Sequence, residues 1–381
     1  MRPAQQPLPY GRQWLDKTDI DAVVATLQSD WLTCGPKVEA FEHALCGYTG
    51  AQYAVAVCNG TAALHLALKA AGIGPGDRVI TSANTFLASA NAAEYNGAIA
   101  DFADIDPQTL CLSLETLKEA WKPDVKAVVA VDFAGYPCVT QEMAAFIHSQ
   151  GAIIIEDACH AIGGYQNGYR IGALPWVDLT TFSFHPVKTM TTGEGGAILT
   201  NNTDWAAACR CLRNHGMVHE TTDQLERPYS MRKLGFNYRI SDIHCALGIN
   251  QLQKLDLFVE RRRSIAASYS AALAKIAEPA VRPALPYPGQ YEAWHLYACR
   301  TNPRHNRDAL RAKLQEHGIG TQIHYYPVHL QPYYSQKYGY ATGKCPQAEK
   351  WFTEGISLPL FPAMTDQDVQ RVREVLHAIS T

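Results

Sequence analysis

The run Gly151-Ala152-Ile153-Ile154-Ile155-Glu156-Asp157-Ala158-Cys159-His160 indicates the fold class. Its apolar residues are consecutive, which is typical of a strand buried on both faces of a parallel sheet. Ligands of such sheets bind beyond the carboxyl ends of the strands, where Asp157 and His160 would lie. The alternative is that Asp157 caps a helix and that His160 is a polar residue at its start. The run therefore predicts an α/β fold with a candidate ligand site at one edge of the sheet.

Further strand-like runs alternate with helical stretches, which favours a mainly parallel sheet with crossover helices. The expected strands are residues 54–57, 78–81, 98–102, 127–132, 152–157 and 197–199, and the expected helices are residues 16–27, 62–71, 240–274 and 307–317. We predict a large domain over residues 15–250 and a smaller C-terminal α+β domain over residues 251–381. The proline-rich segment 279–290 is expected to lead into the small domain, and residues 1–14 are expected to pack near the candidate site.

A second candidate residue is Lys188, in Ser183-Phe184-His185-Pro186-Val187-Lys188-Thr189-Met190-Thr191-Thr192-Gly193-Glu194-Gly195-Gly196. Apolar and aromatic residues precede this lysine, and a glycine-rich turn and a strand follow it, so its amine is expected to be desolvated. Desolvation disfavours the ammonium form and leaves a nucleophile for an aldehyde such as pyridoxal 5'-phosphate, PLP. Asp157 could then keep the pyridine nitrogen of PLP protonated. A lone lysine is more often a surface residue, and only its combination with the other motifs favours catalysis.

The segment Cys58-Asn59-Gly60-Thr61 joins a strand-like run to an alanine- and leucine-rich helix that ends at Gly72. The N-terminus of that helix offers unpaired N–H groups and the positive end of the helix dipole, which suit a phosphate. Gly60 would let the backbone approach closely, and Thr61 would add a hydroxyl group. The segment is neither a Walker loop nor a G-x-G-x-x-G dinucleotide motif. It predicts a phosphate cradle, with the role of the Asn59 side chain left open.

The composition restricts the class of protein. The chain has 381 residues, 47% of them hydrophobic, which is enough for a full core and a second, smaller lobe. A net charge of −3 gives no sign of a nucleic-acid or membrane-surface protein. No apolar run has the length of a membrane span and the first residues lack a signal-peptide core, so we expect a cytoplasmic protein. The 11 cysteines are scattered and are expected to be free thiols, with no metal site.

The order of the motifs resembles that of fold-type I PLP enzymes: a phosphate cradle, the aromatic Phe86, Asp157 and then Lys188. More narrowly, nearly the whole chain resembles the DegT/DnrJ/EryC1/StrS family of sugar aminotransferases. The matching segments are residues 8–13, 29–36, 156–161, 183–196 and 235–239, the last of these reading Gly235-Phe236-Asn237-Tyr238-Arg239. The resemblance implies an aspartate aminotransferase-like fold, PLP as cofactor and a homodimer with shared active sites.

The resemblance also implies roles for individual residues. Lys188 would hold PLP and move the substrate proton, and Asp157 would pair with the pyridine nitrogen. The other PLP contacts would come from His160, Phe86, Gly60, Thr61 and Ser183, and from Asn237 of the neighbouring subunit. The nucleotide sugar would contact Tyr10, Asp30, Trp31, Leu32, Thr33, Gly60, Ser183, Ile323, His324, Tyr325 and Tyr326. Asn59 departs from the family pattern, which usually reads Ser-Gly-Thr where this chain has Asn-Gly-Thr.

Within the family, residues 183–188, 213–217 and 322–327 most resemble one branch. Its members are the transaminases that form UDP-4-amino-4,6-dideoxy-N-acetyl-β-L-altrosamine, on the route to pseudaminic acid. This resemblance implies L-glutamate as amino donor, a UDP-4-keto-6-deoxy-N-acetylhexosamine as acceptor, and ping-pong kinetics because both half-reactions share one site. Arg239 is one candidate for binding the carboxylate of glutamate.

Several alternatives stay open at this level. The acceptor could be another UDP- or dTDP-linked keto-sugar, or the enzyme could act on amino acids alone. A related dehydratase carries histidine in place of the lysine, and Lys188 argues against it although His185 lies close in sequence. A non-enzymatic regulator with a degenerate site would be expected to have lost Lys188 or Asp157, and both are present.

Overall fold

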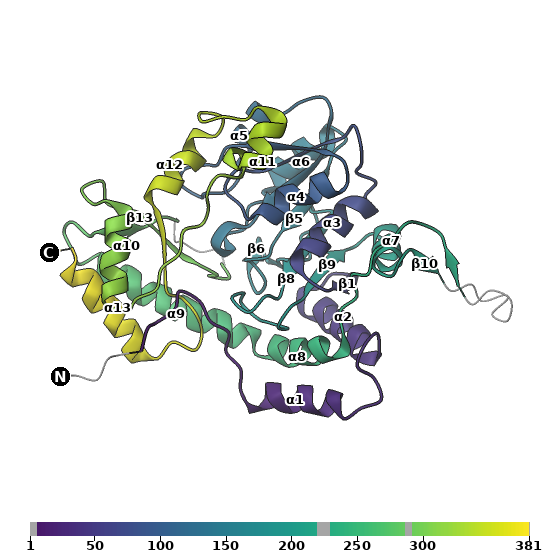
Figure 1. Cartoon of the computed structure of the whole chain (residues 1–381), viewed down its shortest axis with the longest axis horizontal. Helices are drawn as coiled ribbons and strands as arrows, with labels where there is room; N and C mark the ends of the chain where they lie inside the picture. The colour runs from purple at the N-terminus through teal and green to yellow at the C-terminus, as the bar shows by residue number, and fades with distance from the viewer. Residues whose placement is uncertain (1–5, 219–228, 286–291, 381) are drawn as a thin grey trace.

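The central feature of the structure, a computed structural model that describes residues 6–218, 229–285 and 292–380, is a seven-stranded sheet (Figure 1). In spatial order its strands are β1 (Tyr53–Val57), β9 (Gly196–Thr200), β8 (Leu179–Ser183), β5 (Ile153–Asp157), β4 (Val125–Val131), β2 (Arg78–Ser82) and β3 (Ile99–Ala103). β9 runs antiparallel to both of its neighbours, and the other four strand pairs are parallel. The predicted α/β fold with a mostly parallel sheet is confirmed.

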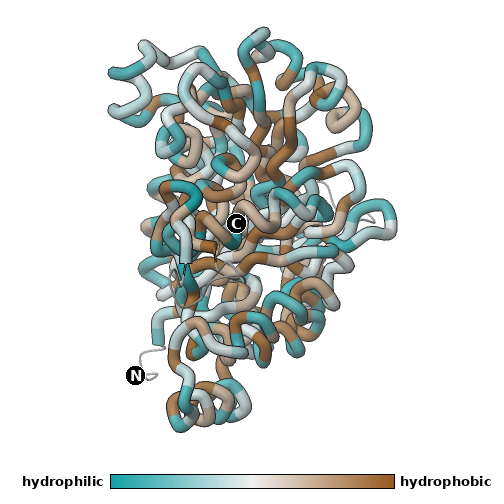
Figure 2. The backbone as a smooth tube through the Cα atoms, turned by 90° about the vertical axis from the view of Figure 1, so that its right-hand side faces the viewer, coloured by the Kyte–Doolittle hydropathy of each residue, from teal (hydrophilic) through white to brown (hydrophobic). Residues whose placement is uncertain are grey.

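Helices cover both faces of this sheet. The helices of this part of the chain are α1 (Lys17–Leu27), α2 (Pro36–Thr49), α3 (Gly60–Ala70), α4 (Leu87–Tyr95), α5 (Leu114–Ala120), α6 (Gln141–Ser149), α7 (Thr203–Arg213) and α8 (Asp242–Gln253). Successive residues of β1 belong to two different apolar cores, because side chains alternate between the faces of a strand: Val55 and Val57 pack in one core, Ala54 and Ala56 in the other. Burial on both faces explains why the strands read as unbroken apolar runs, and Figure 2 shows hydrophilic residues mainly on the outer loops.

A third apolar core lies around a three-stranded antiparallel sheet near the C-terminus. The elements of this part are α9 (Leu255–Leu273), β12 (Val281–Pro283), β13 (Tyr297–Thr301), α10 (Arg307–Glu316), α11 (Pro332–Tyr338), α12 (Pro346–Glu354), β14 (Gly355–Leu358) and α13 (Asp366–Ala378). Leu8 joins this core from the other end of the chain, whereas Tyr334 and Trp351 pack into the core of the large sheet. Segments from each end of the chain therefore pack into the core of the other part. The predicted domain boundary at residue 250 stays a prediction.

Some elements differ from the sequence-based expectations. The helix expected over residues 240–274 is instead two helices, α8 and α9, which meet at Lys254 with φ −101° and ψ 0°. No helix starts at Asp157, since the chain forms turns there. Residues 286–290 of the expected linker lie outside the described part of the chain, and β12 occupies its beginning. Within the described ranges, no helix combines the length and apolar character that crossing a bilayer requires.

Candidate active site

A cavity of about 540 Å³ lies where the carboxyl ends of β4, β5 and β8 meet the N-terminus of α3. Each of these strands supplies its last residue to the wall: Val131, Asp157 and Ser183. The residues lining the cavity are Tyr10, Asn59, Gly60, Thr61, Leu64, Thr85, Phe86, Ala88, Val131, Asp157, Cys159, His160, Ser183, His185, Val187, Lys188, Glu194, His295, Gln322, Ile323, His324 and Tyr325. This position, beyond the carboxyl ends of parallel strands, is the one that open α/β sheets use for ligands. We call it the Lys188 cavity.

Lys188 is desolvated in this cavity. It lies in the loop between β8 and β9, where its backbone N–H donates to the carbonyl oxygen of His185 (2.9 Å). Burial lowers the pKa of the Lys188 ammonium, and the nearby Cys159 and Asp157 oppose that shift. The lowered pKa increases the fraction of neutral amine at a given pH, as the sequence around this lysine predicts.

Asp157 is held by two donors. The Ser89 hydroxyl on α4 donates to Oδ2 (2.6 Å), and the backbone N–H of Cys159 donates to Oδ1 (3.3 Å). Thr85, which also lines the cavity, lies 2.7 Å from the Ser89 hydroxyl. The carboxylate is therefore fixed in direction while it faces the cavity. Sequence reasoning missed Ser89, because its local sequence gives no sign of a contact with Asp157, 68 positions away.

Three histidines surround the amine. Burial is the main cause that lowers the pKa of His160, His295 and His324, and the charge of Lys188 contributes to each shift. For His324 the pKa falls to about 3. The backbone N–H of Ala134 donates to Nδ1 of His160 (3.3 Å), which leaves the proton of the neutral ring on Nε2, 3.4 Å from the Tyr325 hydroxyl. All three imidazoles are therefore neutral at physiological pH and add no positive charge beside Lys188.

His295 is a cavity residue that the sequence did not reveal. Its ring is 4% exposed and lies 4.2 Å from the ring of His160, and its Nδ1 has no hydrogen-bond partner in the described structure. Its sequence context, Trp294-His295-Leu296, carries no recognisable motif. Glu194, Gln322 and Thr85 also line the cavity; Glu194 and Gln322 belong to segments that match the family pattern, but the sequence assigned no role to any of the three.

The phosphate cradle has the expected geometry at its glycine. A Cβ atom on Gly60 would lie 2.8 Å from the Cβ of Ser183, so only glycine allows this approach of α3 to β8. The Asn59 side chain caps α3 by accepting from the N–H of Ala62 (2.8 Å), which answers the question that the sequence left open. The N–H groups of Gly60 and Thr61 at the helix start, with the hydroxyls of Thr61 and Ser183, are the groups that could hold a phosphate.

Other predicted residues do not line the Lys188 cavity of the same chain. Asp30 to Thr33 lie in an exposed segment, in which Trp31 is 56% exposed, and Tyr326 is 43% exposed. Asn237 forms a backbone bridge with Asn214 instead of reaching the cavity. Arg239 donates to the side chain of Asn214 (2.8 Å) and lines a second cleft together with Glu42, Arg210 and Arg213.

The donor set of the cavity suits PLP. Three groups line the same cavity: the backbone at Gly60, where α3 begins and no Cβ fits; the fixed carboxylate of Asp157; and the desolvated amine of Lys188. These groups match, in turn, a phosphate, a protonated pyridine nitrogen and an aldehyde. In the described structure Phe86 has its ring at the mouth of the cavity and is 57% exposed.

Comparisons with known proteins agree on one family. The sequence model of the DegT/DnrJ/EryC1/StrS aminotransferase family matches residues 13–377. The Bacillus subtilis spore coat polysaccharide biosynthesis protein SpsC is 38% identical over 98% of this chain and 97% of its own length. Helicobacter pylori PseC, an aminotransferase involved in the biosynthesis of pseudaminic acid, superposes with a TM-score of 0.91 at 26% identity, covering 98% of this chain and 99% of its own. The PLP form of the sugar aminotransferase Spr1654 from Streptococcus pneumoniae gives 0.90 at 27% identity over 98% of both chains.

Proposed function

The chain belongs to the DegT/DnrJ/EryC1/StrS aminotransferase family, and from this premise we propose that it moves an amino group from L-glutamate to C4 of a UDP-linked 4-keto-6-deoxy-N-acetylhexosamine. Membership makes it a PLP-dependent sugar aminotransferase. The observation that carries the proposal is the desolvated Lys188 amine, which shares one cavity with the fixed carboxylate of Asp157 and the cradle at Gly60. The choice of sugar is supported by the overall likeness to PseC, an aminotransferase involved in the biosynthesis of pseudaminic acid.

The cavity wall beyond the cradle suits a sugar substrate. Tyr10, Gln322 and His324 bring polar groups to it, and Phe86 and Ile323 bring apolar surface. A small set of polar groups on an apolar wall is the usual composition of a small-molecule site. The exposed segment of residues 30–33 is the proposed contact for the nucleotide, with Trp31 offering a flat apolar surface.

Bound PLP supplies an aldehyde carbon to which amines attach and a ring that withdraws electrons from the substrate carbon. Asp157 holds the proton on the pyridine nitrogen, and Ser89 and the Cys159 N–H keep its carboxylate pointed into the cavity. Gly60, Thr61 and Ser183 hold the phosphate. Lys188 Nζ would take the proton from the α-carbon of glutamate and pass it to the former aldehyde carbon of PLP, and it would carry out the reverse transfer for the sugar. A lowered lysine pKa suits this exchange, because a base works best when its pKa is near the working pH.

The surroundings protect this chemistry. His160, His295 and His324 are neutral, so they carry no positive charge that would repel a protonated Lys188 or a protonated pyridine nitrogen. Burial, with the nearby Asp157, raises the pKa of the Cys159 thiol, so this sulfur does not compete with Lys188 as a nucleophile. Lys188 is therefore the reactive amine of the cavity, beside three neutral imidazoles, a protonated thiol and a fixed carboxylate.

We also propose a homodimer with shared active sites. In support, Asn237 lies outside the Lys188 cavity of its own chain, where it could reach a partner's phosphate. The neighbouring segment exposes large apolar side chains, with Leu234 79% and Met231 65% exposed. Exposed apolar side chains gathered in one region are typical of interaction surfaces.

The test is a visible absorption spectrum of the purified protein loaded with PLP, recorded before and after L-glutamate and again after the UDP-4-keto sugar. Glutamate should bleach the band of protein-bound PLP, because the amino group passes to the cofactor, and the keto-sugar should restore it. The Lys188→Ala protein is the matched control, since it keeps the cavity but lacks the reactive amine.

The possible results separate the parts of the proposal. Restoration by a dTDP-linked sugar but not by the UDP-sugar would overturn the acceptor, and restoration by 2-oxo acids alone would overturn any sugar acceptor. A protein that stays colourless after incubation with PLP would contradict the function as a whole.

A further inference from the structure

The N-terminal segment of the chain passes along the outside of the loop that carries Lys188. We call residues 8–14 the strap and residues 184–195, between β8 and β9, the Lys188 loop. The strap is fixed at its start by the Leu8 N–H, which donates to the Gly318 carbonyl (2.8 Å), and midway by the Leu360 N–H, which donates to the Tyr10 carbonyl (3.1 Å). Tyr10 lines the Lys188 cavity, and four residues later Trp14 lines a narrow crevice behind Lys188. The strap therefore lines both the cavity and the crevice to which Lys188 also belongs.

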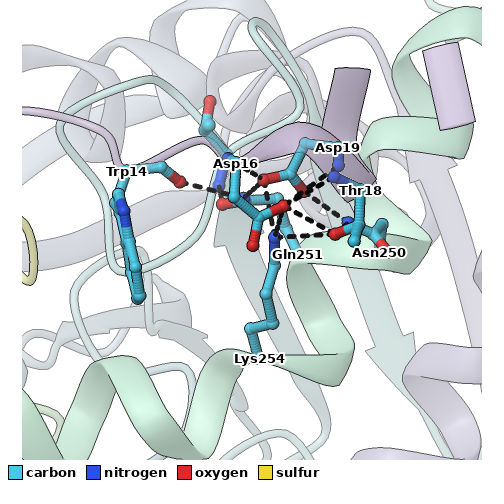
Figure 3. Close-up of polar contacts among 8 residues, drawn as sticks. Trp14, Asp16, Thr18, Asp19, Asn250, Gln251 and Lys254 are labelled. Atoms are coloured by element: carbon cyan, nitrogen blue, oxygen red, sulfur yellow. Dashed lines mark hydrogen bonds and ion pairs between the residues drawn. The ribbon is translucent and has the colours of Figure 1, made fainter. Parts of the chain in front are cut away.

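Gln251 on α8 is the residue where the strap and the Lys188 loop meet. Its side chain is 1% exposed and lines the same crevice as Lys188. Its Nε2 donates to the Trp14 carbonyl (3.1 Å) and to Asp19 Oδ2 (3.0 Å), and its Oε1 accepts from the Thr191 N–H (3.4 Å). Figure 3 shows Gln251 between Trp14 and Asp19, with Asn250 beside it on α8 and Lys254 at the C-terminal end of that helix. One amide thus joins the strap, α1 and the Lys188 loop.

The orientation of this amide is determined by its partners. A carboxylate and a carbonyl accept hydrogen bonds only, so the NH₂ group must face Asp19 and Trp14 and the oxygen must face Thr191. Asp19 is itself fixed, because Lys254 Nζ (2.6 Å) and Asn250 Nδ2 (2.7 Å) also donate to it. Although burial opposes the shift, these donors hold the pKa of Asp19 below its ordinary value. The network therefore presents a rigid acceptor to the Lys188 loop.

The loop makes few hydrogen bonds outside itself, although Phe184 and Met190 anchor it by packing into an apolar core. Its own residues supply most of its hydrogen bonds, such as Lys188 N–H to His185, Thr192 N–H to Phe184 and Thr191 hydroxyl to Phe184. Within the described part of the chain, Gln251 is the one side chain beyond Ser183 that hydrogen-bonds to this loop. The Thr191 bond is long for an N–H···O contact, so its strength depends on how firmly Gln251 is held.

We propose that Gln251 is a positioning residue that ties the Lys188 loop to the strap and so aligns the lysine amine with the substrate-facing Tyr10. This role rests on Lys188 being the PLP-binding lysine of the proposed function. Gln251 touches neither substrate nor cofactor and acts through Thr191 and Trp14. Nothing in the sequence motif around Lys188 contains this role, because Gln251 lies 60 positions further along the chain.

The experiment compares Gln251→Met with Asn250→Ala. The methionine keeps the length of the side chain and removes all three hydrogen bonds. Asn250→Ala is the matched control, because Asn250 donates to Thr18 Oγ1 (2.8 Å) and to Asp19 but not to the Lys188 loop. Hydrogen–deuterium exchange of the protein without added PLP should become faster on the order of tenfold in residues 184–195 and 8–14 of Gln251→Met, since a net hydrogen bond is worth about that factor. In Asn250→Ala these two segments should exchange as in the wild type.

Two readouts on the PLP-loaded protein test alignment rather than fold. The pH at which the visible band of bound PLP changes should shift in Gln251→Met and stay in place in Asn250→Ala. kcat should fall while KM for L-glutamate stays nearly constant, because substrate contacts are retained. Gln251→Glu, which keeps the shape but turns an oxygen toward Asp19 and the Trp14 carbonyl, should give the same pattern and replaces Gln251→Met if that protein does not fold.

Unchanged exchange in residues 184–195 of both Gln251 variants would overturn the proposal, and so would faster exchange without any change in the pH midpoint or kcat. If wild-type protein failed to bind PLP while the exchange pattern held, the proposed function would be wrong and the tie between strap and loop would stand.

Discussion

Two hollows of similar size lie in this molecule, and they differ in how their charges are satisfied. The cleft lined by Glu42, Arg210, Arg213 and Arg239 has a volume of about 620 Å³, against about 540 Å³ for the Lys188 cavity. In the arginine-lined cleft Glu42 accepts from Arg213 (2.5 Å) and from the Ala56 N–H (2.9 Å). In the Lys188 cavity an amine and three imidazoles are desolvated, and their pKa values are lowered.

The comparison shows that volume does not identify a reaction site. In the arginine-lined cleft the Glu42 carboxylate is already bonded to Arg213 and to the Ala56 N–H. This pairing connects α2, β1 and α7, so we assign the cleft a structural role. A desolvated titratable group that forms no ion pair within the protein is available to a ligand, and groups of this kind gather at functional sites. The two hollows should therefore respond in opposite ways to substitution, one in turnover and the other in stability.

The largest effect should come from Lys188→Ala. Loss of the amine removes the base that moves the substrate proton, so turnover should fall by at least about 10³-fold, within the range that acid–base catalysis contributes. Thermal stability should change little or rise, because a desolvated amine that opposes burial is removed. Steady-state kinetics measures the loss of turnover, and thermal unfolding measures the change in stability. Turnover near the wild-type rate would contradict the assignment of the site.

The opposite response is expected from Glu42→Ala in the arginine-lined cleft. The substitution leaves Arg213 and the Ala56 N–H without their shared acceptor, and Glu42 is only 7% exposed, so the free energy of unfolding should fall by about 2–4 kcal/mol. Turnover per folded molecule should stay within about twofold, because no cavity residue is touched. Urea unfolding measures the free energy of unfolding, and kinetics combined with active-site titration measures turnover per folded molecule. A large loss of turnover with normal stability would break the comparison, since it would make this cleft a second functional site.

The sequence predicted features that depend on local patterns and missed those that depend on contacts between distant residues. The strands were predictable because burial on both faces leaves an unbroken apolar run, and Lys188, Asp157 and Gly60 were found because each lies in a local pattern that carries its chemistry. Ser89 and His295 were missed because their importance depends on contacts with Asp157 and His160, 68 and 135 positions away, which only the fold creates. The interruption of the helix at Lys254 was also missed, because no glycine or proline marks it in the sequence.

The smallest effect concerns the reverse face of β5, behind the Lys188 cavity. Glu156 and Asp157 are consecutive in that strand, so their side chains point to opposite faces. Asp157 faces the cavity, while Glu156 is fully buried, accepts from the Thr180 hydroxyl (2.9 Å) and lies close to the buried Asp132. Each acid of this pair has one buried oxygen without a hydrogen-bond partner in the described structure, Oε1 in Glu156 and Oδ2 in Asp132. Two buried carboxyl groups in contact are most stable when they share a proton.

This pair predicts that stability falls on the alkaline side. Burial raises the pKa of Glu156 to about 7, above its value in an unfolded chain, so the folded protein binds this proton more tightly than the unfolded one does. The stabilisation is fully present below about pH 4.5 and is lost as the pH rises toward and past 7. In Glu156→Gln the amide can donate to Asp132 at every pH and still accept from Thr180, so the loss should disappear. Between pH 6 and pH 8 the variant should gain about 1 kcal/mol relative to the wild type, measured from urea midpoints. The exposed Glu119→Gln is the control, and an equal pH dependence in wild type and Glu156→Gln would show that the carboxyl pair does not share a proton.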